Sequence, residues 1–225
     1  MIKLPDPKEA FFYENSFYLT CSNQRINKIL SCYELFKMAL HIPGAIVECG
    51  VFKGVSLIRW ATFRDIFSDL SAKRIIGFDI FGKYPEANLP EDKLHRKSFI
   101  NGAGKGISKE QLESILVQKD ITNVELVAGD IVKTAPRYVE QHPGLKISLL
   151  YLDCPIYEPV FSALENFYDR IMPGGLLLLN GYAKIAQLGE TKAVDDFFTN
   201  SDISIRRLPF SFSPCYLIKK THQTA

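Results

Sequence analysis

The sequence predicts an α/β fold: a doubly wound, mostly parallel sheet with an antiparallel hairpin at one edge and a helical extension at the N-terminus. Short apolar strand patterns alternate with helical patterns from Ala45 onward, as in a parallel sheet with helices on both faces. The stretch 147–152 is apolar nearly throughout, as expected for a central strand that is covered on both sides. No helical pattern separates the last two strand patterns, so we expect them to form the antiparallel hairpin.

The individual elements follow from local patterns. Apolar residues recur at helical spacing over 26–40, and Pro43-Gly44 stops that helix. Ser108 is a suitable N-cap for a helix over 108–117, and Gln111 completes a capping box. The polar stretch 82–106 has no clear period, and we expect a long loop of functional importance there. The other expected strands are 45–49, 74–78, 124–128, 176–179, 203–208 and 215–218, and the other expected helices are 55–67, 134–141, 160–171 and 190–198.

Length and charge limit the possible classes of protein. The 225 residues suit one main domain over 43–220, preceded by a lid or helical extension over 1–42 and followed by a short tail over 221–225. The net charge of +2 gives no global attraction to nucleic acid or to an anionic membrane. No apolar run is long enough to span a bilayer, and the N-terminus does not resemble a signal peptide. The five cysteines are scattered, so we expect reduced, mostly buried thiols in a cytoplasmic protein.

The N-terminal region is unusually rich in aromatic residues. Exposed aromatic side chains often mark interfaces, so this region is expected to form a lid or the contact of a homodimer. Docking onto the domain's own core is the alternative. The residues concerned are Phe11, Phe12, Tyr13, Phe17 and Tyr18.

The ends of the first three parallel strands predict an adenosine-binding site. Open α/β sheets bind ligands beyond the carboxyl ends of their strands. The first strand runs into a turn with two glycines, which allows a close approach of backbone to ligand. The second strand ends in an acid that can accept hydrogen bonds from ribose hydroxyls, and the third ends in an acid that can bind an adenine amino group. The expected ligand-binding residues are Glu48, Gly50, Val51, Phe52, Gly54, Ser56, Asp79, Phe81, Gly129, Asp130 and Ile131.

Each signal has a plainer interpretation when taken alone. The glycine pair also suits a tight strand-to-helix turn, and Asp79 also suits an N-cap. The turn matches neither the dinucleotide-binding Gly-x-Gly-x-x-Gly pattern nor a P-loop, which disfavours a nicotinamide enzyme. The succession of three such strand ends is what favours an adenosine-containing ligand.

Longer motifs resemble the macrocin O-methyltransferase family, whose members methylate hydroxyls of sugars and natural products. The resemblance covers roughly 24–219 and includes the late stretch 189–198. It implies a seven-stranded, Rossmann-like class I methyltransferase sheet, S-adenosylmethionine as cofactor, and a small-molecule acceptor. Glu48 and Gly50 would line the methionine end, Asp79 the ribose, and Asp130 with Ile131 the adenine. The motifs are Pro43-Gly44-Ala45-Ile46-Val47-Glu48-Cys49-Gly50-Val51, Phe78-Asp79-Ile80-Phe81-Gly82, Leu152-Asp153-Cys154-Pro155-Ile156-Tyr157-Glu158-Pro159 and Pro173-Gly174-Gly175.

The acidic set of that family is largely missing here. Its fourth-strand motif is similar to Leu-Asp-x-Asp-x-Tyr-Glu, in which the first Asp binds a divalent metal and the second acts as base. This chain keeps Asp153 but has Pro155 in the second position, and Asn180-Gly181 stands where the family has Asp-Asp. A hard cation prefers several oxygen ligands, so Asp153 with one amide predicts a weak metal site at most. Asp153 remains the expected catalytic residue.

The loss of the base leaves two functions open. Methyl transfer to a hydroxyl needs the proton removed, and proline cannot accept it. Replacement bases by residue type are Tyr157, Tyr182 and Lys184, together with His95 in the expected loop. The leading hypothesis is an O-methyltransferase with a degenerate metal and base site. The alternative is a catalytically inactive relative that binds the cofactor or a partner protein.

Overall fold

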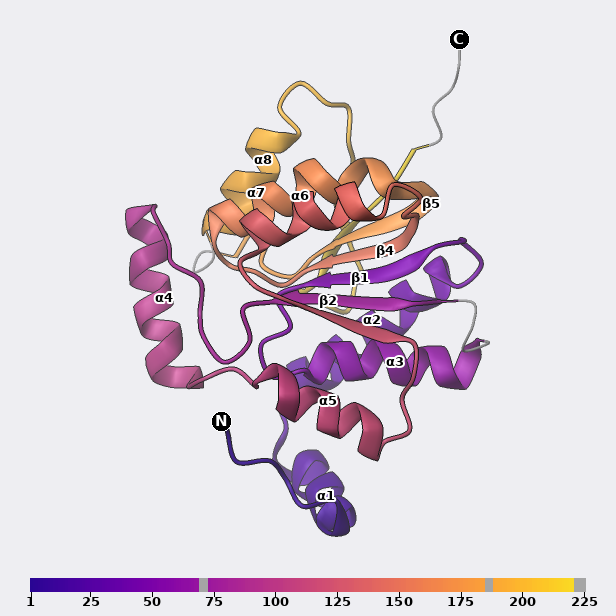
Figure 1. The fold of residues 1–225 in the computed structure, drawn as a ribbon, viewed down its shortest axis with the longest axis vertical. Helices are drawn as coiled ribbons and strands as arrows, with labels where there is room; N and C mark the ends of the chain where they lie inside the picture. Colours follow the sequence, from indigo (N-terminus) through magenta and orange to yellow (C-terminus); the bar gives the residue numbers. More distant parts are fainter. Residues whose placement is uncertain (69–72, 185–187, 221–225) are drawn as a thin grey trace.

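The computed structural model describes residues 1–68, 73–184 and 188–220, and it confirms the doubly wound α/β fold (Figure 1). Seven strands form one sheet in the order β3-β2-β1-β4-β5-β7-β6. The first five strands run parallel, while β7 pairs antiparallel with both β5 and β6. The predicted hairpin therefore closes one edge of the sheet. The predicted tail over 221–225 lies outside the described residues.

The strands agree closely with the sequence pattern. Four of them have the predicted bounds, because each is a short, mostly apolar run bounded by turns or loops. The strands are β1 (Ala45–Cys49), β2 (Ile75–Asp79), β3 (Val124–Ala128), β4 (Ile147–Leu152), β5 (Ile171–Leu179), β6 (Arg206–Arg207) and β7 (Cys215–Ile218).

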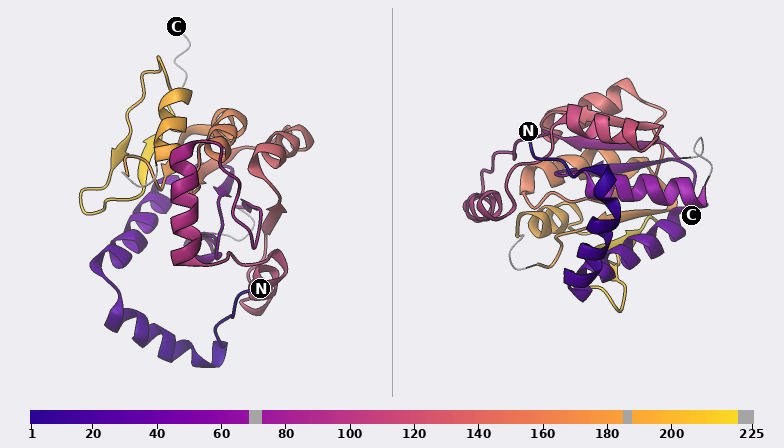
Figure 2. Two further views of the ribbon diagram at one scale, coloured as in Figure 1. Left: turned by 90° about the vertical axis from the view of Figure 1, so that its left-hand side faces the viewer. Right: turned by 90° about the horizontal axis from the view of Figure 1, so that it is seen from below.

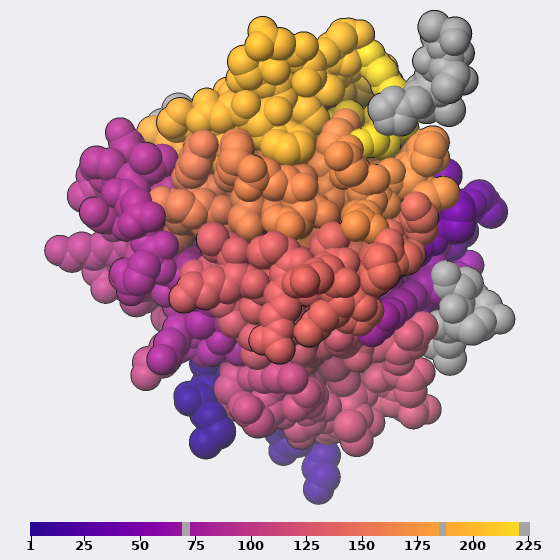
Figure 3. All heavy atoms as spheres, turned by 45° about the horizontal axis from the view of Figure 1, so that its top comes forward, coloured from indigo at the N-terminus to yellow at the C-terminus, as the bar shows by residue number. Residues whose placement is uncertain are grey.

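Helices cover both faces of this sheet (Figure 1), and Figure 3 shows the face that α6, α7 and α8 form. Helices α2, α3 and α5 pack on one face around Trp60, and α6, α7 and α8 pack on the other around Phe78 and Phe167. The helices are α1 (Ala10–Thr20), α2 (Asn23–Ala39), α3 (Val55–Phe67), α4 (Pro90–Ala103), α5 (Lys109–Gln118), α6 (Ile131–Gln141), α7 (Tyr157–Phe167) and α8 (Leu188–Phe197), with 3-10 turns at Pro7–Glu9 and Tyr168–Arg170.

The predicted loop over 82–106 is wrong in its second half, which forms helix α4. Pro90 opens the helix, and Glu91 and Asp92 in its first turn complement the helix dipole. Asp92 is the only residue of α4 that is buried, so the helix shows no apolar stripe in the sequence. Its carboxylate accepts the backbone N–H of Tyr157 at 2.9 Å and that of Gly189, which fastens α4 to the starts of α7 and α8.

Several other boundaries differ from the prediction, most of them by one to three residues. Helix α6 begins at Ile131 rather than Thr134, because Asp130 caps it and Pro136 is tolerated inside it. The predicted helix over 160–171 ends early in a 3-10 turn, and β5 begins at Ile171, so Pro173-Gly174-Gly175 lies within a strand and not between elements. The strand predicted over 203–208 is only two residues long.

The N-terminal helices differ in their packing. Helix α2 buries Leu35 and Phe36 against the sheet, whereas α1 has no buried residue. Figure 2 shows α1 standing away from the body as part of an arch. The N-terminal end of the arch, which comprises the chain from its start through α1 and α2, is anchored to α5. There Gln111 accepts a hydrogen bond from the backbone N–H of Ile2 and donates one to its carbonyl. The aromatic side chains of α1 are therefore exposed, which contradicts the alternative in which they dock on the domain's own core.

No helix within the described residues has the length and apolar character needed to cross a membrane.

Candidate active site

Two cavities meet at the carboxyl ends of the central strands. The first encloses about 490 Å³ of empty space, and the second is a larger open cleft of about 1350 Å³. The two cavities have several lining residues in common, which we call their shared wall, and Asp153, directly after β4, is one of these residues. A ligand in the first cavity can therefore come close to a ligand in the second beside Asp153. The shared residues are Gly50, Phe52, Tyr84, Asp153 and Pro155.

The first cavity gathers the three strand ends that the sequence singled out. Asp79 is the last residue of β2, Asp130 and Ile131 follow β3, and Gly50 follows β1, and all four line this cavity. Most of the remaining lining is apolar, from residues such as Ile156 and Pro159. An apolar slot with a few acceptors at its ends suits a flat base joined to a hydroxyl-bearing sugar.

Asp79 organises the turn that follows β1. Its carboxylate accepts the backbone N–H groups of Val51 at 2.7 Å, Phe52 at 2.8 Å and Phe81 at 2.7 Å. Phe52 and Phe81 have positive φ angles of 51° and 55°, and these hydrogen bonds hold both turns in that conformation. Burial raises the pKa of Asp79, and hydrogen bonds from the backbone N–H groups of Phe52, Phe81, Val51 and Ile80 oppose that shift. Much of the acceptor capacity of this carboxylate is thus used by the backbone, and ribose binding by Asp79 remains a prediction.

Glu48 has a carboxylate oxygen without a partner. The side chain is fully buried; Ser56 donates to Oε1, and Oε2 has no hydrogen-bond partner. Burial raises the pKa of Glu48 to about 8, an effect that the Ser56 hydrogen bond reduces. A buried polar atom without a partner is costly and rare in native structures. A hydrogen-bond donor such as an ammonium group would satisfy Oε2.

The glycines of the first turn are required by backbone geometry. Gly50 has φ +94°, and a Cβ there would collide with the carbonyl group of Asp153. Gly54 caps α3 with φ +79°, and Gly129 after β3 has φ +139°. The turn around Gly50 therefore brings the first strand end against the fourth without an intervening side chain.

The second cavity is lined by a concentration of positive charge. Arg25 and Lys28 come from α2, Lys53 from the glycine turn and Arg59 from α3. Among the described residues that line this cleft, Asp153 is the one carboxylate. Lys28 Nζ lies 3.7 Å from Asp153 Oδ2, so one of the four cations has an acidic partner.

Two hydrogen-bond donors hold the carboxylate of Asp153. The Asn180 amide donates to Oδ1, and the Tyr151 hydroxyl donates to Oδ2 at 3.0 Å. Asn180 is itself fixed, because Ser213 donates to its Oδ1 at 2.9 Å. Glu190 is buried on α8 and accepts the N–H of Gly181 at 2.7 Å, which shapes the loop after β5. Asp153 thus has a fixed orientation at the wall between the two cavities.

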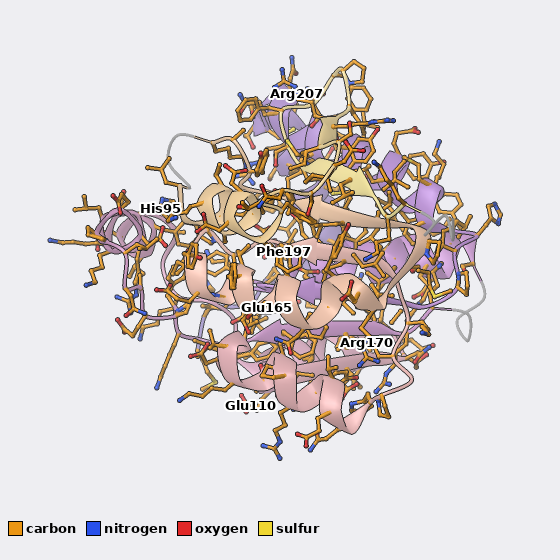
Figure 4. All side chains as sticks on the ribbon, turned by 90° about the horizontal axis from the view of Figure 1, so that it is seen from above. His95, Glu110, Glu165, Arg170, Phe197 and Arg207 are labelled. Atoms are coloured by element: carbon orange, nitrogen blue, oxygen red, sulfur yellow. The ribbon has the colours of Figure 1, made fainter. Side chains whose placement is uncertain are left out.

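The candidate replacement bases are mostly directed elsewhere. The Tyr157 and Tyr182 hydroxyls donate to Asp196 and Asp195, respectively. His95 was expected in a loop but lies on α4, at the margin of the molecule, and lines neither cavity (Figure 4). Burial lowers the pKa of Lys184, and the nearby Asp153 carboxylate opposes that shift.

Several site residues were not predicted from the sequence. Tyr84 lines both cavities, and its buried hydroxyl has no partner in the structure. Arg25 with Lys28, and Ser56 with Arg59, are spaced three residues apart on their helices, which places each pair on one helix face. The spacing of these residues could be read from the sequence. That α2 packs beside the cleft could not be predicted from it.

The model of the macrocin O-methyltransferase family matches residues 16–206 of this chain. A tetracenomycin 4'-O-methyltransferase from Streptomyces olivaceus, which acts on a 2,3-dimethoxy-rhamnosyl derivative, is 27% identical over 164 residues. The match covers 71% of this chain and 60% of that protein. Demethyldecarbamoylnovobiocin O-methyltransferase from Streptomyces niveus is 24% identical over 191 residues, covering 80% and 68% of the two chains. The chain thus spans about 60% of the length of the first of these relatives.

The fold also matches solved methyltransferase structures. The calicheamicin methyltransferase CalS11 superimposes with a TM-score of 0.79 at 26% identity, covering 96% of this chain and 86% of that one. This similarity extends over nearly all of the chain, so the two proteins share the fold.

Proposed function

The chain belongs to the macrocin O-methyltransferase family, whose cofactor is S-adenosylmethionine, and on that premise we propose that it methylates a hydroxyl of a small sugar-like or natural-product acceptor. The observation that carries this proposal is the shared wall of the two cavities. It allows an adenosyl group in the first cavity and an acceptor in the second to meet beside Asp153. The names of its curated relatives, which act on a rhamnosyl derivative and a novobiocin precursor, agree with this class of acceptor.

Residues of the first cavity, together with the buried Glu48 next to Ser56, would hold the cofactor at three points. Glu48 would pair with the amino group of the methionine end, Asp79 would accept a ribose hydroxyl, and Asp130 with Ile131 would contact the adenine. The unpartnered Oε2 of Glu48 supports the first of these contacts. When bound, the cofactor supplies an electrophilic methyl group on a positively charged sulfur.

Asp153 would act on the acceptor hydroxyl. As the new C–O bond forms and the C–S bond breaks, the hydroxyl proton passes to the Asp153 carboxylate and then to solvent. Asn180 and Tyr151 hold the carboxylate in place for that transfer. Close positioning of the two reactants accounts for much of the acceleration, roughly 7–11 kcal/mol in well-oriented systems.

We propose that this reaction needs no divalent metal. Both Asp153 oxygens already accept hydrogen bonds, and the Lys28 ammonium lies beside them. Pro155 and Gly181 offer no side-chain oxygen, and Asn180 Oδ1 is engaged by Ser213. No group of three His, Cys, Asp or Glu residues in the described ranges is placed to hold a metal. This donor set does not fit a hard cation that prefers several free oxygens.

The direct test measures cofactor binding and turnover under metal-free conditions. We expect S-adenosylhomocysteine to bind in a calorimetric titration and labelled methyl groups to pass from S-adenosylmethionine to at least one hydroxylated acceptor. EDTA should change the rate by less than about twofold, because no cation takes part in proton removal.

Two outcomes would contradict the proposal. An activity lost in EDTA and restored by Mg²⁺ would show that the remaining oxygens do hold a metal. Tight binding of S-adenosylhomocysteine without turnover across a broad acceptor panel would favour the catalytically inactive alternative.

We also propose that the enzyme is a homodimer joined through α1. Phe11, Phe12, Tyr18 and Leu19 are between 61% and 85% exposed on this helix, and none of its residues is buried. An apolar surface of this kind gains roughly 25 cal/mol for each Å² that it buries. A symmetric contact between two copies of α1 would cover it without any other partner.

Substitution within α1 tests the dimer. Phe12→Glu combined with Leu19→Glu should convert a dimer to a monomer in light scattering coupled to gel filtration, because the charges would be buried at the interface. Val117→Glu is the matched control, since Val117 is 80% exposed on α5. A monomeric parent protein at micromolar concentration would rule the dimer out.

The five cysteines are unpaired in the structure. Unpaired, mostly buried thiols support a reducing compartment, and we propose the cytoplasm as the site of action.

A further inference from the structure

The ammonium of Lys28 lies beside Asp153 with its hydrogen-bond donors unused. Lys28 stands on α2 and lines the second cavity together with Asp153 and Asn180. Its Nζ lies 3.7 Å from Asp153 Oδ2, which makes an ion pair but exceeds the usual N–H···O hydrogen-bond range of about 2.7–3.2 Å. The side chain forms no hydrogen bond with another described residue. The three N–H donors of the ammonium are therefore free to bind a ligand in the cleft.

Lys28 is better placed for this than the other cations near the site. Among the described residues that line the cleft, it is the one cation with an ion pair to Asp153. Arg59 donates to the thiol sulfur of a buried cysteine at 3.6 Å, and Lys53 donates to a backbone carbonyl at 2.7 Å. Lys184 and Asp153 also interact electrostatically, but the ion pairs of the described residues include none between these two side chains.

Both members of the ion pair are partly shielded from water and fixed in place. The side chains of Lys28 and Asp153 are 29% and 27% exposed, respectively. Cys32, one helical turn after Lys28, is fully buried, so α2 is packed against the domain at this point. The Asp153 carboxylate is held by Asn180 and Tyr151. A charge in such partly dry surroundings acts more strongly on a neighbouring atom than it does in water.

The separation of the two groups suits one bridging oxygen atom. An oxygen about 2.7–2.9 Å from each atom fits between Lys28 Nζ and Asp153 Oδ2, since these two atoms are 3.7 Å apart. A hydroxyl at this point can accept a hydrogen bond from the ammonium and donate its own proton to the carboxylate. Asp153 lines both cavities, whereas Lys28 lines the second and not the first. The ammonium therefore approaches that oxygen from the acceptor's side and leaves the first cavity free for the cofactor.

An ammonium at this position has a chemical use. When the acceptor hydroxyl loses its proton and attacks the methyl group, negative charge develops on its oxygen. Donors aimed at developing charge lower the barrier, and such electrostatic stabilisation is often the largest contribution to catalysis. The donor set around Asp153 does not suit a hard divalent cation, because Asn180 and both carboxylate oxygens are already engaged. A side-chain cation is then the available source of positive charge beside the acceptor oxygen.

We propose that Lys28 is a second catalytic residue, whose ammonium donates a hydrogen bond to the acceptor oxygen while Asp153 takes the hydroxyl proton. This inference rests on the proposed function and adds a residue to its mechanism. The O–H bond breaks and its proton goes to the Asp153 carboxylate. The C–O bond forms as the C–S bond breaks, and the electron pair of the C–S bond stays on sulfur. Lys28 keeps its proton throughout and is unchanged at the end of the reaction.

Removal of the ammonium tests this role. The full chain and Lys28→Ala are assayed with S-adenosylmethionine and the hydroxylated acceptor of the panel that gives the parent protein its highest kcat/KM. We expect Lys28→Ala to lower kcat by about 10²–10³-fold, the effect of losing one donor to a developing oxyanion. KM for the acceptor should rise by less than about fivefold, because the contact strengthens as charge develops on the oxygen. Affinity for S-adenosylhomocysteine should stay within about threefold, since Asp153 keeps its two donors.

A free amine should restore part of the lost activity. The cleft is open and encloses about 1350 Å³, so methylammonium can enter the space that the Lys28 side chain vacates. We expect methylammonium chloride to raise kcat of Lys28→Ala about tenfold, and recovery stays incomplete because a free amine lacks the fixed position of a tethered one. Tetramethylammonium chloride at equal ionic strength is the control. It has the charge but no N–H donor, so it should not restore activity.

Lys37→Ala is the matched control variant. It removes the same ammonium from an exposed position of the same helix, where Lys37 pairs with Glu34. Its kcat should stay within about twofold of the parent value, and methylammonium should not change it. A difference between the two variants then reflects the position of Lys28 and not a general loss of charge.

Three outcomes would overturn the inference and leave the methyltransferase proposal standing. The first is a kcat of Lys28→Ala within about threefold of the parent value, and the second is a loss that methylammonium does not reduce. The third is equal recovery with methylammonium and tetramethylammonium, which would show that no hydrogen bond is donated. Failure to bind S-adenosylhomocysteine, or absence of turnover with every acceptor, would overturn the proposed function itself.

Discussion

Asp153→Asn is expected to lower kcat by about 10²–10⁴-fold, the range that positioned acid–base groups contribute. The amide has the shape of the carboxylate but cannot accept the acceptor's proton. Affinity for S-adenosylhomocysteine should change by less than about threefold, since Asp153 lies where the two cavities meet and is not one of the residues assigned to bind the cofactor. Single-turnover kinetics with S-adenosylmethionine and a methylated-product assay measure the first quantity, and calorimetry measures the second.

Tyr151→Phe is the matched control for this substitution. It removes one donor to Asp153 Oδ2 and leaves the carboxylate and its bond from Asn180 in place. Tyr151 is fully buried, so the variant needs a melting curve to show that it folds. We expect a loss in kcat of about tenfold or less, because one orienting hydrogen bond is removed rather than the base. If Asp153→Asn kept a kcat within threefold of the parent, Asp153 would not be the proton acceptor.

The sequence predicted those parts of the fold that depend on local pattern. Strands β1, β3, β4 and β7 have the predicted bounds because each is a short, mostly apolar run between turn residues. The capping box of Ser108 and Gln111 is present for the same reason, since its signal lies within four residues. Helix α4 was missed because Asp92 is its single buried residue, so the helix shows no apolar period.

In the candidate site, too, the residues that follow from local pattern were predicted and those that depend on packing between distant segments were not. Asp79, Asp130 and Asp153 were predicted because each ends a parallel strand, and the topology of such sheets brings strand ends to one edge. The cations of the cleft were not predicted, because α2 precedes the sheet and its approach depends on packing between distant segments. Lys28 and Asp153 are 125 residues apart in the chain, and no local pattern reports their ion pair.

Glu48→Gln should weaken the binding of S-adenosylhomocysteine by about 10–100-fold, the effect of losing a charge-assisted hydrogen bond in a buried site. The variant keeps the shape of the side chain and an oxygen that can accept from Ser56. It removes the negative charge that would pair with the cofactor's ammonium. Ser56→Ala is the control, because it removes the donor to Oε1 while Oε2 remains available; we expect it to weaken binding less than tenfold.

The dependence of this binding on pH follows from the raised pKa of Glu48, about 8 in the free protein. Below that value the carboxyl is protonated and must lose its proton to pair with the ammonium. Affinity should therefore rise about tenfold for each pH unit between pH 6 and 7.5, and flatten near 8, where an α-amino group itself begins to deprotonate. In Glu48→Gln the rise should vanish, because no proton is released on binding.

The same pKa has a consequence for the stability of the free protein. Since burial raises the Glu48 pKa above its ordinary value, its contribution to folding is present at low pH and is lost as pH rises toward 8. Burial likewise raises the pKa of Glu190 to about 8, so this residue also makes the folded protein less stable as pH rises. Bound S-adenosylhomocysteine should offset only the Glu48 part, because its ammonium would compensate that carboxylate alone. Melting temperatures from pH 6 to 8.5 should therefore fall less steeply with the ligand than without it, and Glu48→Gln should remove that difference in slope. Parallel slopes in the parent protein would show that the ammonium does not reach Glu48.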